Sequence, residues 1–247
     1  MPTLAVDTST EVLAVALGEG EQVLSELSID AGRSHLEMLL PAIQGMLADT
    51  GMAIGDVTAI VAGTGPGAFS GLRVGIATAR ALSQSLEVPL FGYSSLEALA
   101  NGLAEGMDDS MPRWILPLID ARRGQVFARL YKKEGEKGLN PESEVLCLDP
   151  ERVSEILPEE SAGAVRSGGN GAQAYREILS AEKRLDLLRA DDRANRMRAI
   201  WHVEAAETVG IAAGFRPDQL LRVLPLYVRE PDADKTVLLK KREPWLK

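Results

Sequence analysis

The sequence predicts an α/β protein of two related lobes, each with a mixed β-sheet flanked by helices. Short apolar strands alternate with helical patterns along the chain, and an apolar strand that ends on an aspartate and is followed by a returning strand occurs in each half. The length of 247 residues suits one large domain or two small lobes. Together these observations favour the two-lobed arrangement.

The repeated feature is a hairpin that carries an acidic residue. TLAVDTSTEVLAVAL overlays without gaps on the later stretch that contains LPLIDARRGQVFARL, so that Asp7 pairs with Asp120 and Leu13 pairs with Val126. Two lobes that each open on an acidic hairpin are typical of actin, sugar kinases and heat-shock chaperone ATPases. The predicted fold is therefore actin-like (ASKHA, ribonuclease H-like), with duplicated mixed β-sheets.

The first lobe is predicted over residues 1–106. Short β-rich runs joined by polar turns predict a meander of three strands, and apolar spacing and turn residues then predict alternating helices and strands. The expected strands are 3–8, 12–18, 22–28, 57–63 and 88–93, and the expected helices are 34–49, 70–85 and 94–104.

The helix at 34–49 has apolar residues at helical spacing, from Leu36 to Leu47. Ser34 and Glu37 predict a capping box at its start. Pro41 lies inside the pattern, so a kink or a break is expected near Leu40.

The second lobe is predicted over residues 107–200. The stretch 113–131 predicts strand, turn and strand, and 164–179 predicts strand, glycine turn and helix. A further helix at 201–215, ended by Gly214 and Pro217, is assigned to complete the first lobe. For the tail at 231–247, both disorder and ordering on assembly are left open.

Composition limits the function classes. The formal charge of −9 argues against a protein that grips nucleic acid by neutralising phosphates, so a role near RNA is expected to be indirect. Direct contact with tRNA through Arg193, Arg196 and Arg198 or through the basic tail remains a separate hypothesis. A single cysteine, Cys147, with no leader or membrane-spanning pattern, favours a cytoplasmic protein.

The stretch GTGPGAFSGLRVGIATARAL, residues 63–82, loosely matches a dinucleotide-binding fingerprint. Pro66 removes one backbone N–H from the loop, and no acid follows the next strand, so phosphate binding is disfavoured. Gly71, Gly75 and Ala79 recur every four residues and form one smooth helix face that another helix could approach. Packing of this face on the lobe's own sheet is the alternative.

Four segments resemble the TsaB (YeaZ) family: LAVDTSTEVLAVAL, SHLEMLLPAI, GTGPGAFSGLRVGIATARALSQSLEVPLFGYSSLEALA and PLYVRE. The resemblance covers most of the first hundred residues and residues 224–230, whereas the second lobe matches only loosely. It implies the two-lobed actin-like fold. It also implies a bacterial partner protein in the threonylcarbamoyl modification of the tRNA adenosine beside the anticodon, in tRNAs that decode ANN codons.

The catalytic relatives of this family, called TsaD, carry a His-x-x-x-His metal motif, and the equivalent positions by counting are Ser95 and Leu99. A hydroxyl and an alkyl group do not replace two imidazoles, so no metal site and no catalytic residue are expected. The two histidines, His35 and His202, have no partner at ligand spacing.

Nucleotide binding is similarly weakened, because Asp120 is followed by Ala121 and two arginines. The remaining candidates for a nucleotide site are weak. They are Asp7, Asp120, Gly168 and Gly169. No cofactor is expected in the isolated chain, although the resemblance leaves open ATP or ADP at the interface of a complex.

The favoured hypothesis is a non-catalytic subunit that binds and activates TsaD through the helices at 34–49 and 70–85. TsaE is a further expected member, the chain alone is expected to form a homodimer, and no membrane is involved. A bulky residue at Gly75 is expected to abolish association without unfolding the lobe. The candidate partner-contact residues are Leu39, Leu40, Ile43, Gly71, Gly75 and Ala79.

The alternative hypothesis is a metal- or ATP-dependent hydrolase or transferase of the glycoprotease-like type.

Overall fold

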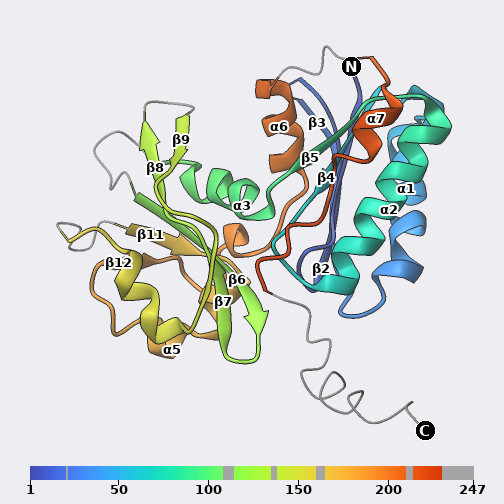
Figure 1. Ribbon diagram of the computed structural model, residues 1–247. Coiled ribbons are helices and arrows are strands. Elements are labelled where there is room, and N and C mark those ends of the chain that lie inside the picture. The colour runs from blue at the N-terminus through green and yellow to red at the C-terminus, as the bar shows by residue number, and fades with distance from the viewer. Residues whose placement is uncertain (21, 108–113, 135–137, 160–164, 210–213, 230–247) are drawn as a thin grey trace, which may run out of the picture.

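The computed structural model describes residues 1–20, 22–107, 114–134, 138–159, 165–209 and 214–229. Figure 1 shows two lobes side by side, each with a β-sheet and helices packed against it. The predicted α/β two-lobed fold is confirmed. The tail at 231–247 lies outside the described residues.

The first sheet has the strand order β3-β2-β1-β4-β5. β1 is antiparallel to β2 and parallel to β4, which is itself parallel to β5. The strands are rich in β-branched and aliphatic residues, and β1 and β4 are buried along their whole length, as expected for central strands covered on both faces. Their bounds are β1 Thr3–Asp7, β2 Val12–Glu19, β3 Gln22–Asp30, β4 Ala59–Gly63 and β5 Leu90–Tyr93.

The second sheet repeats this topology. Its main order is β10-β7-β6-β11-β12, with β6 antiparallel to β7 and parallel to β11, and a side hairpin of β8 and β9 joins β6. The equivalence of the two orders supports the duplication inferred from sequence. The bounds are β6 Trp114–Arg122, β7 Gln125–Ala128, β8 Tyr131–Glu134, β9 Gly138–Pro141, β10 Leu146–Leu148, β11 Val165–Gly168 and β12 Leu185–Leu187.

The gap-free overlay of the two hairpins is right in the outgoing strands and wrong by one residue in the returning strands. Asp7 is paired across the hairpin with Ala14, whereas Asp120 is paired with Val126. Val126 therefore corresponds to Ala14 rather than to Leu13. The second hairpin has one residue fewer than the first between these paired positions, and it also has a register irregularity between Asp120 and Arg122.

The helices form layers around the sheets (Figure 1). α1 (His35–Thr50) and α2 (Phe69–Leu86) cover the outer face of the first sheet, where one apolar cluster joins them to β1, β2 and β4. α3 (Ser95–Ala104) and α6 (Ile200–Val209) lie between the two sheets in a second cluster that draws on both lobes. A third cluster fills the outer side of the second sheet.

Short helices complete the chain. α4 (Asn170–Ala174) and α5 (Arg176–Leu179) replace the single helix expected up to residue 179, and α7 (Pro217–Leu220) lies in the last described segment. Of the helix expected at 201–215, the structure describes α6 up to Val209, and residues 210–213 lie outside the described part. Three 3₁₀ turns are described, at Ile54–Asp56, Pro150–Ile156 and Arg193–Asn195.

The capping box expected for α1 is wrong, and of the kink or break expected near Leu40 the break does not occur. Ser34 precedes the helix but makes no side-chain capping bond, so the expected capping box does not form. The helix also runs without a break from His35 to Thr50 with Pro41 inside it. Packing of its apolar face on the sheet, through Leu39, Ile43 and Met46, holds the helix together across the proline.

Candidate functional site

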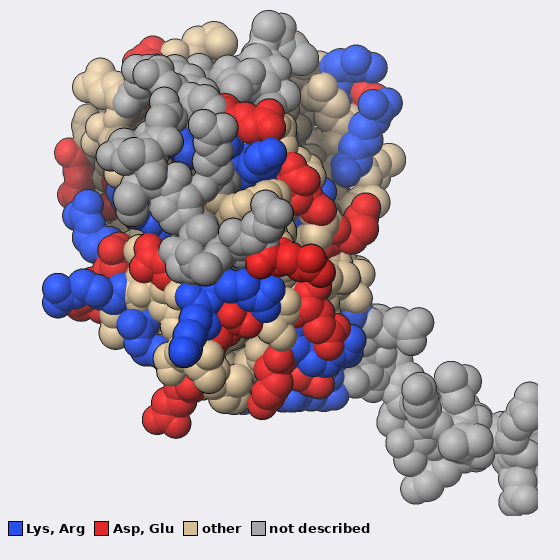
Figure 2. Space-filling model, turned by 90° about the vertical axis from the view of Figure 1, so that its left-hand side faces the viewer, with Lys and Arg blue, Asp and Glu red and all other residues tan. Residues whose placement is uncertain are grey.

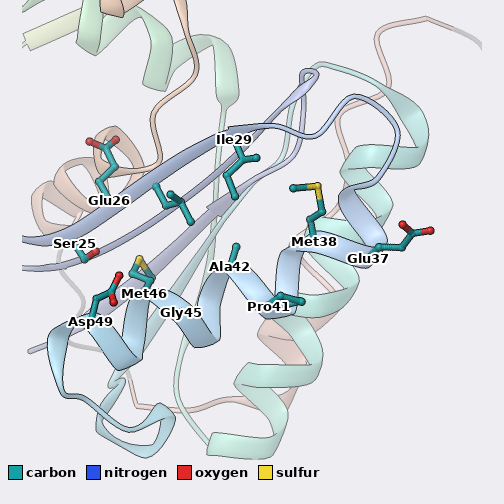
Figure 3. Close-up of a pocket in the computed structure, with 11 residues that line it drawn as sticks. Ser25, Glu26, Ile29, Glu37, Met38, Pro41, Ala42, Gly45, Met46 and Asp49 are labelled. Carbon is teal, nitrogen blue, oxygen red and sulfur yellow. The ribbon is translucent and has the colours of Figure 1, made fainter.

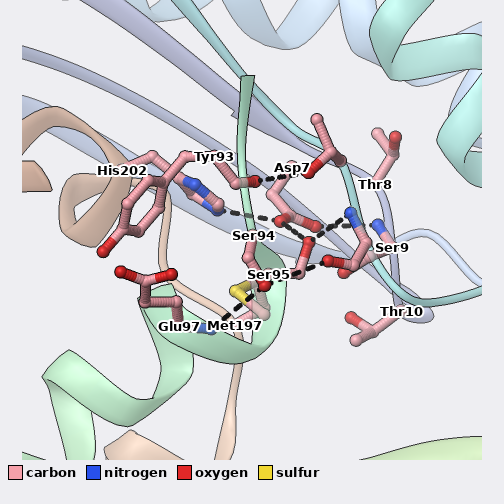
Figure 4. A network of polar contacts seen from close by, with 12 residues as sticks. Asp7, Thr8, Ser9, Thr10, Tyr93, Ser94, Ser95, Glu97, Met197 and His202 are labelled. Atoms are coloured by element: carbon pink, nitrogen blue, oxygen red, sulfur yellow. Dashed lines mark hydrogen bonds and ion pairs between the residues drawn. The ribbon is translucent and has the colours of Figure 1, made fainter. Parts of the chain in front are cut away.

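A buried polar cluster surrounds Asp7 at the end of β1 (Figure 4). One carboxylate oxygen, Oδ2, is 2.8 Å from Nε2 of His202 on α6 and accepts a hydrogen bond of 2.6 Å from the Ser95 hydroxyl at the start of α3. The other oxygen, Oδ1, accepts the backbone N–H of Ser9 at 2.7 Å. Asp7, Ser95 and His202 are all fully buried, so the cluster links three elements in the interior.

The electrostatics of the cluster favour an ionised carboxylate. Burial raises the pKa of Asp7, but the hydrogen bond and charge of His202, together with the hydrogen bonds from Ser9 and Ser95, outweigh burial and leave this pKa below its ordinary value. A charged group in the interior is tolerated only when it is paired in this way.

The connectivity of the cluster differs from that of a catalytic triad. The Ser95 hydroxyl donates to Asp7 and accepts the N–H of Gly65 at 3.1 Å, whereas His202 is bonded to the same carboxylate from the other side. A serine nucleophile is instead activated by a base that takes its proton directly. The observed arrangement holds elements together without presenting a nucleophile to solvent.

Sequence reasoning missed this cluster. Asp7 and His202 are 195 residues apart, and neither strand nor helix periodicity contains a signal for their contact. In the sequence, His202 stands only as a histidine without a partner at ligand spacing. The one available hint was a polar residue inside the apolar pattern of the helix that begins near Trp201.

The glycine-rich loop between β4 and α2 is filled by the chain itself. Its carbonyl at Gly65 accepts the Ser95 N–H at 2.9 Å, and the N–H of Ala68 bonds to the Ser9 carbonyl at 2.7 Å. A Cβ atom at Gly67 would lie 2.2 Å from that same carbonyl oxygen. The glycines therefore allow β1, α3 and the loop to approach closely.

The small-residue face of α2 points inward, which corrects the expectation that it faces a partner. Cβ atoms at Gly71 and Gly75 would lie 2.2 Å and 2.3 Å from the carbonyl and hydroxyl oxygens of Thr8. The Thr8 hydroxyl also donates to the Gly71 carbonyl at 2.8 Å. Ala79, two turns after Gly71, is fully buried in the same lobe. Because these positions carry little or no side chain, α2 can lie directly against the turn after β1.

Only one of the six candidate partner-contact residues lies on the surface. Leu40 is 49% exposed, whereas Leu39 and Ile43 are in the core under α1. Apolar side chains do face outward from the same two helices, at other positions. Leu36 is 74% exposed and Phe69 is 42% exposed. The contact with a partner stays a prediction, but the residues able to make it are different.

A cluster of two aromatic rings and an arginine marks this outward surface. The rings of Phe69 and Tyr227 lie 5.0 Å apart, and the guanidinium carbon of Arg73 is 3.8 Å from the centre of the Phe69 ring. Arg73 Nε donates to the Tyr227 hydroxyl at 3.1 Å. Further exposed apolar side chains, Leu221, Leu224 and Leu226, come from the segment that follows α7. We call Leu36, Leu40, Phe69, Arg73 and Tyr227 the helix surface.

The nucleotide candidates of the second lobe are in contact with other parts of the chain. Asp120 accepts hydrogen bonds from the Arg122 N–H at 2.8 Å and from the Tyr175 hydroxyl at 3.2 Å. Cβ atoms at Gly168 and Gly169 would lie 2.6 Å from Leu103 and 2.3 Å from the Leu118 carbonyl. The cavity found beside them, lined by Glu11, Asn170 and Met197 among others, measures about 30 Å³, which is enough for one or two water molecules. Nucleotide at the interface of a complex remains a prediction.

The arginines proposed for tRNA contact are largely engaged in ion pairs. Arg196 lies 2.8 Å from Asp30, and Arg198 Nε bonds to both oxygens of Glu26 at 3.1 Å. These pairs attach the segment before α6 to β3. Arg193 is exposed. On the face drawn in Figure 2, basic and acidic side chains are interspersed and form no continuous basic patch.

Ser95 and Leu99, which counting along the family resemblance sets against the metal motif, are both buried. Ser95 is bonded within the Asp7 cluster, and Leu99 is 2% exposed. Within the described residues, no group of three or more His, Cys, Asp or Glu side chains is arranged to hold a metal ion. His35 is buried at the start of α1.

Among the helices that the structure describes, none has the length and apolar character needed to cross a membrane.

The chain resembles known proteins over most of its length. Residues 28–222 match the family model described as "TsaD: tRNA N6-adenosine threonylcarbamoyltransferase". The protein named tRNA threonylcarbamoyladenosine biosynthesis protein TsaB of Escherichia coli K12 is 32% identical over 178 residues, which are 72% of this chain and 75% of that protein. The chain belongs to the TsaB family.

Other relatives agree with this assignment. The TsaB protein of Bacillus subtilis 168 is 39% identical over 53% of this chain and 56% of that protein. A crystal structure of a Pseudomonas aeruginosa protein, described as uncharacterized with similarity to peptidase YEAZ, superposes with a TM-score of 0.74 at 28% identity. It covers 92% of this chain and 99% of that chain, so the two-lobed fold is shared almost throughout.

Proposed function

We propose that the chain is a non-catalytic subunit that binds and activates a TsaD-type threonylcarbamoyltransferase in tRNA threonylcarbamoyladenosine biosynthesis. Membership of the TsaB family supports the pathway. The observation that carries the non-catalytic part is the Asp7 cluster, in which Ser95 stands at a counted metal-ligand position and is fully buried. Its hydroxyl holds the loop and β1 together instead of facing a substrate.

The helix surface is the region best suited to bind the partner. It combines exposed leucines on α1 with Phe69 and Arg73 at the start of α2 and with the neighbouring ring of Tyr227. Tyr, Trp and Arg are enriched among the residues that dominate binding energies. Because a partner with the same fold would present equivalent helices, two pairs of helices would meet. The same surface would form a homodimer when the partner is absent.

Binding to TsaD tests the proposed surface. The double variant Leu36→Asp with Leu40→Asp should weaken association with TsaD at least tenfold, because two charges would have to be desolvated in the contact. Isothermal titration calorimetry measures the affinity. Ile178→Asp is the matched control, because Ile178 is 40% exposed on the second lobe. Equal affinities of the double variant and the wild type would contradict this surface.

Reconstitution tests the proposed role. Modification of tRNA by TsaD and the enzyme that makes its precursor should depend on this chain, while the isolated chain should turn over neither ATP nor substrate. In the assembled system, Ser95→Ala should keep the rate within about threefold, since loss of a nucleophile typically lowers a rate by orders of magnitude. Turnover by the isolated chain would favour the hydrolase or transferase alternative. Adding TsaE and nucleotide to the same assay tests whether either is needed.

A further inference from the structure

A groove separates α1 from the edge strand β3 (Figure 3). Its volume is about 560 Å³. Ile29 points from β3 toward the helix, and Met38 and Met46 point from α1 toward the strand. The walls are mostly apolar, and methionine side chains adapt easily to a bound segment.

One stripe of α1 forms the rim of the groove. It consists of four exposed residues at intervals of four along the helix: Glu37, Pro41, Gly45 and Asp49. Three of these residues lower the stability of a helix. Pro41 removes a main-chain N–H from the helix interior, Gly45 lacks a side chain, and Asp49 places a negative charge in the last turn, where the helix dipole opposes it.

Packing within the chain does not account for this stripe. A Cβ atom at Gly45 would meet nothing within 4 Å, unlike Gly71 and Gly75, whose missing side chains are explained by contact with Thr8. Asp49 is exposed and has no cationic partner among the described residues. The stripe is better explained by a molecule that lies against it, because the rim leaves space for one.

The groove also borders an unpaired strand edge. β3 is the last strand of its sheet and pairs only with β2 among the described residues. Ion pairs from Arg196 to Asp30 and from Arg198 to Glu26 hold this strand in place. A fixed and unpaired edge can accept an added strand through its main-chain N–H and C=O groups, and proteins generally cover such edges.

The free charges of the groove are negative. Glu37 and Asp49 line it, and neither has an ion-pair partner within the described part of the chain, whereas the third acid, Glu26, is paired with Arg198. Because Pro41 has no N–H, the Glu37 carbonyl also lacks its regular helical donor. The groove therefore favours an occupant with positively charged side chains near both ends.

The two free carboxylates set the spacing of these charges. Glu37 and Asp49 are twelve residues apart on α1, which corresponds to about 18 Å along a helix axis. In Figure 3, Ser25 lies at the end of the groove where Asp49 is, and Ile29 lies nearer the end where Glu37 is, so the helix runs along the strand. Side chains on one face of an added strand recur every second residue, and six residues cover about 20 Å. Two basic residues six positions apart therefore reach both acids from the face that carries the apolar side chains between them.

The groove is separate from the helix surface defined above. Leu36 and Gly45 are nine residues apart on α1, and so are Leu40 and Asp49, which corresponds to two and a half turns. The members of each pair therefore project from opposite sides of the helix. A partner that covers the helix surface leaves the groove accessible.

We propose that this groove binds an extended segment of a partner protein, which adds a strand to the free edge of β3. The apolar side chains of the segment, at alternate positions, cover the methionine and isoleucine side chains of the groove. A basic residue at each end of the segment pairs with Glu37 or Asp49. This is a second contact, in addition to the one proposed for a TsaD-type partner, and it does not depend on that contact.

Binding of a synthetic peptide to the full chain tests the proposal. The peptide Lys-Thr-Val-Thr-Val-Thr-Lys has both lysines and both valines on one face when it is extended. The control peptide, Thr-Lys-Val-Thr-Val-Lys-Thr, has the same composition but has its lysines on the face opposite to the valines. NMR of the methionine methyl groups follows binding, with the buried Met107 as the reference. The first peptide should shift the signals of Met38 and Met46 and bind about fivefold tighter than the control, because only the first peptide can form both ion pairs.

Variants of the chain locate the bound peptide. Gly45→Leu places a side chain at the rim and should abolish the shifts, whereas Gln44→Leu, at an exposed position that does not line the groove, should leave them unchanged. Asp49→Lys should weaken binding of the first peptide about fivefold. Leu36→Asp with Leu40→Asp should bind it as tightly as the wild type, because these residues project from the opposite side of α1.

Three results would overturn the proposal. The first is the absence of shifts at Met38 and Met46, and the second is an equal affinity for the two peptides. The third is a binding site elsewhere, shown either by shifts that persist in Gly45→Leu or by loss of binding in the variant of Leu36 and Leu40.

Discussion

The two acidic hairpins have equivalent positions in their sheets but different surroundings. Asp7 is fully buried and bonded to His202 and Ser95, whereas Asp120 lies near the surface and is bonded to Arg122 and Tyr175. The first hairpin packs against α1, α2 and α6, whereas the second packs against α3 and the short helix α4. The first hairpin thus holds the interior of the first lobe together. The second hairpin lies where the two lobes meet.

This difference teaches that a repeated motif does not predict a repeated role. In the first lobe, long helices exclude water from Asp7, and its buried carboxylate bonds to other elements of the interior. In the second lobe, Arg122 and Arg123 both adopt left-handed backbone conformations at the hairpin tip, and Arg122 reaches across to Glu11 of the first lobe. Substitutions at equivalent positions of the two hairpins should therefore have unequal effects on the free energy of unfolding.

The largest difference is expected between the two aspartates. Asp7→Ala should lower the free energy of unfolding by about 3–5 kcal/mol, because it leaves His202 and Ser95 without their buried partner. Asp120→Ala should cost about 1 kcal/mol or less, because its partners reach solvent. Urea unfolding measures both values. Similar losses for the two variants would mean that the burial of Asp7 is not what distinguishes the hairpins.

A bulky side chain at Gly75 should be nearly as damaging. Gly75→Leu forces Thr8 away from α2 and should cost about 3 kcal/mol or more, because overpacking a close contact moves the backbone. This prediction differs from the sequence-based expectation that the lobe stays folded with a bulky residue at Gly75. Gly45→Leu is the control, since Gly45 is exposed and a Cβ atom there meets nothing within 4 Å, so the change in stability should be less than about 1 kcal/mol. Thermal unfolding of both variants measures the contrast.

Lowering the pH should destabilise the first hairpin through protonation of Asp7. Its pKa is below the ordinary value of 3.8, so the folded state binds fewer protons than the unfolded state in the range between the two values. The stabilisation is complete above about pH 5 and is lost as the pH falls through the folded-state pKa. In Asp7→Asn the unfolding free energy should fall less steeply below pH 4 than in the wild type. Parallel pH curves would contradict this assignment.

The smallest effect is expected where the two lobes meet. Glu11 accepts from Asn170 at 3.0 Å and from Arg122 at 3.3 Å, and its side chain is 37% exposed. Glu11→Ala should cost about 1 kcal/mol or less, and the loss should shrink further at 0.5 M salt, since exposed charges are screened. A salt-independent loss of several kcal/mol would instead indicate a buried structural contact.

Much of the first lobe could be predicted because its signals are local. The strands at β1, β2 and β4 and the helices α1, α2 and α3 follow from apolar spacing and turn residues, and their bounds agree with the sequence within a few residues. The strands β8, β9, β10 and β12 were not predicted. They are short and half-exposed, and a three- or four-residue strand leaves little periodicity to detect.

The candidate site was harder to predict because it depends on contacts between distant segments. The spacing of Gly71, Gly75 and Ala79 correctly indicates a smooth helix face, but spacing does not reveal what that face contacts. Thr8 provides the answer, from a turn more than sixty residues away. In the same way, the helical pattern around Leu39 and Leu40 identifies an amphipathic helix, and only the packed structure shows that Leu39 is inside and Leu40 outside.

The position of α6 has a consequence for synthesis of the chain. Trp201 is fully buried against α3, where a Cβ atom at Gly102 would lie 2.0 Å from the indole ring. The ribosome therefore releases the first sheet long before the helix that covers its inner face, and the intervening second lobe must emerge first. Until Trp201 and His202 leave the exit tunnel, the nascent amino-terminal half has an uncovered apolar face, and it becomes a native lobe only when the other half has been made.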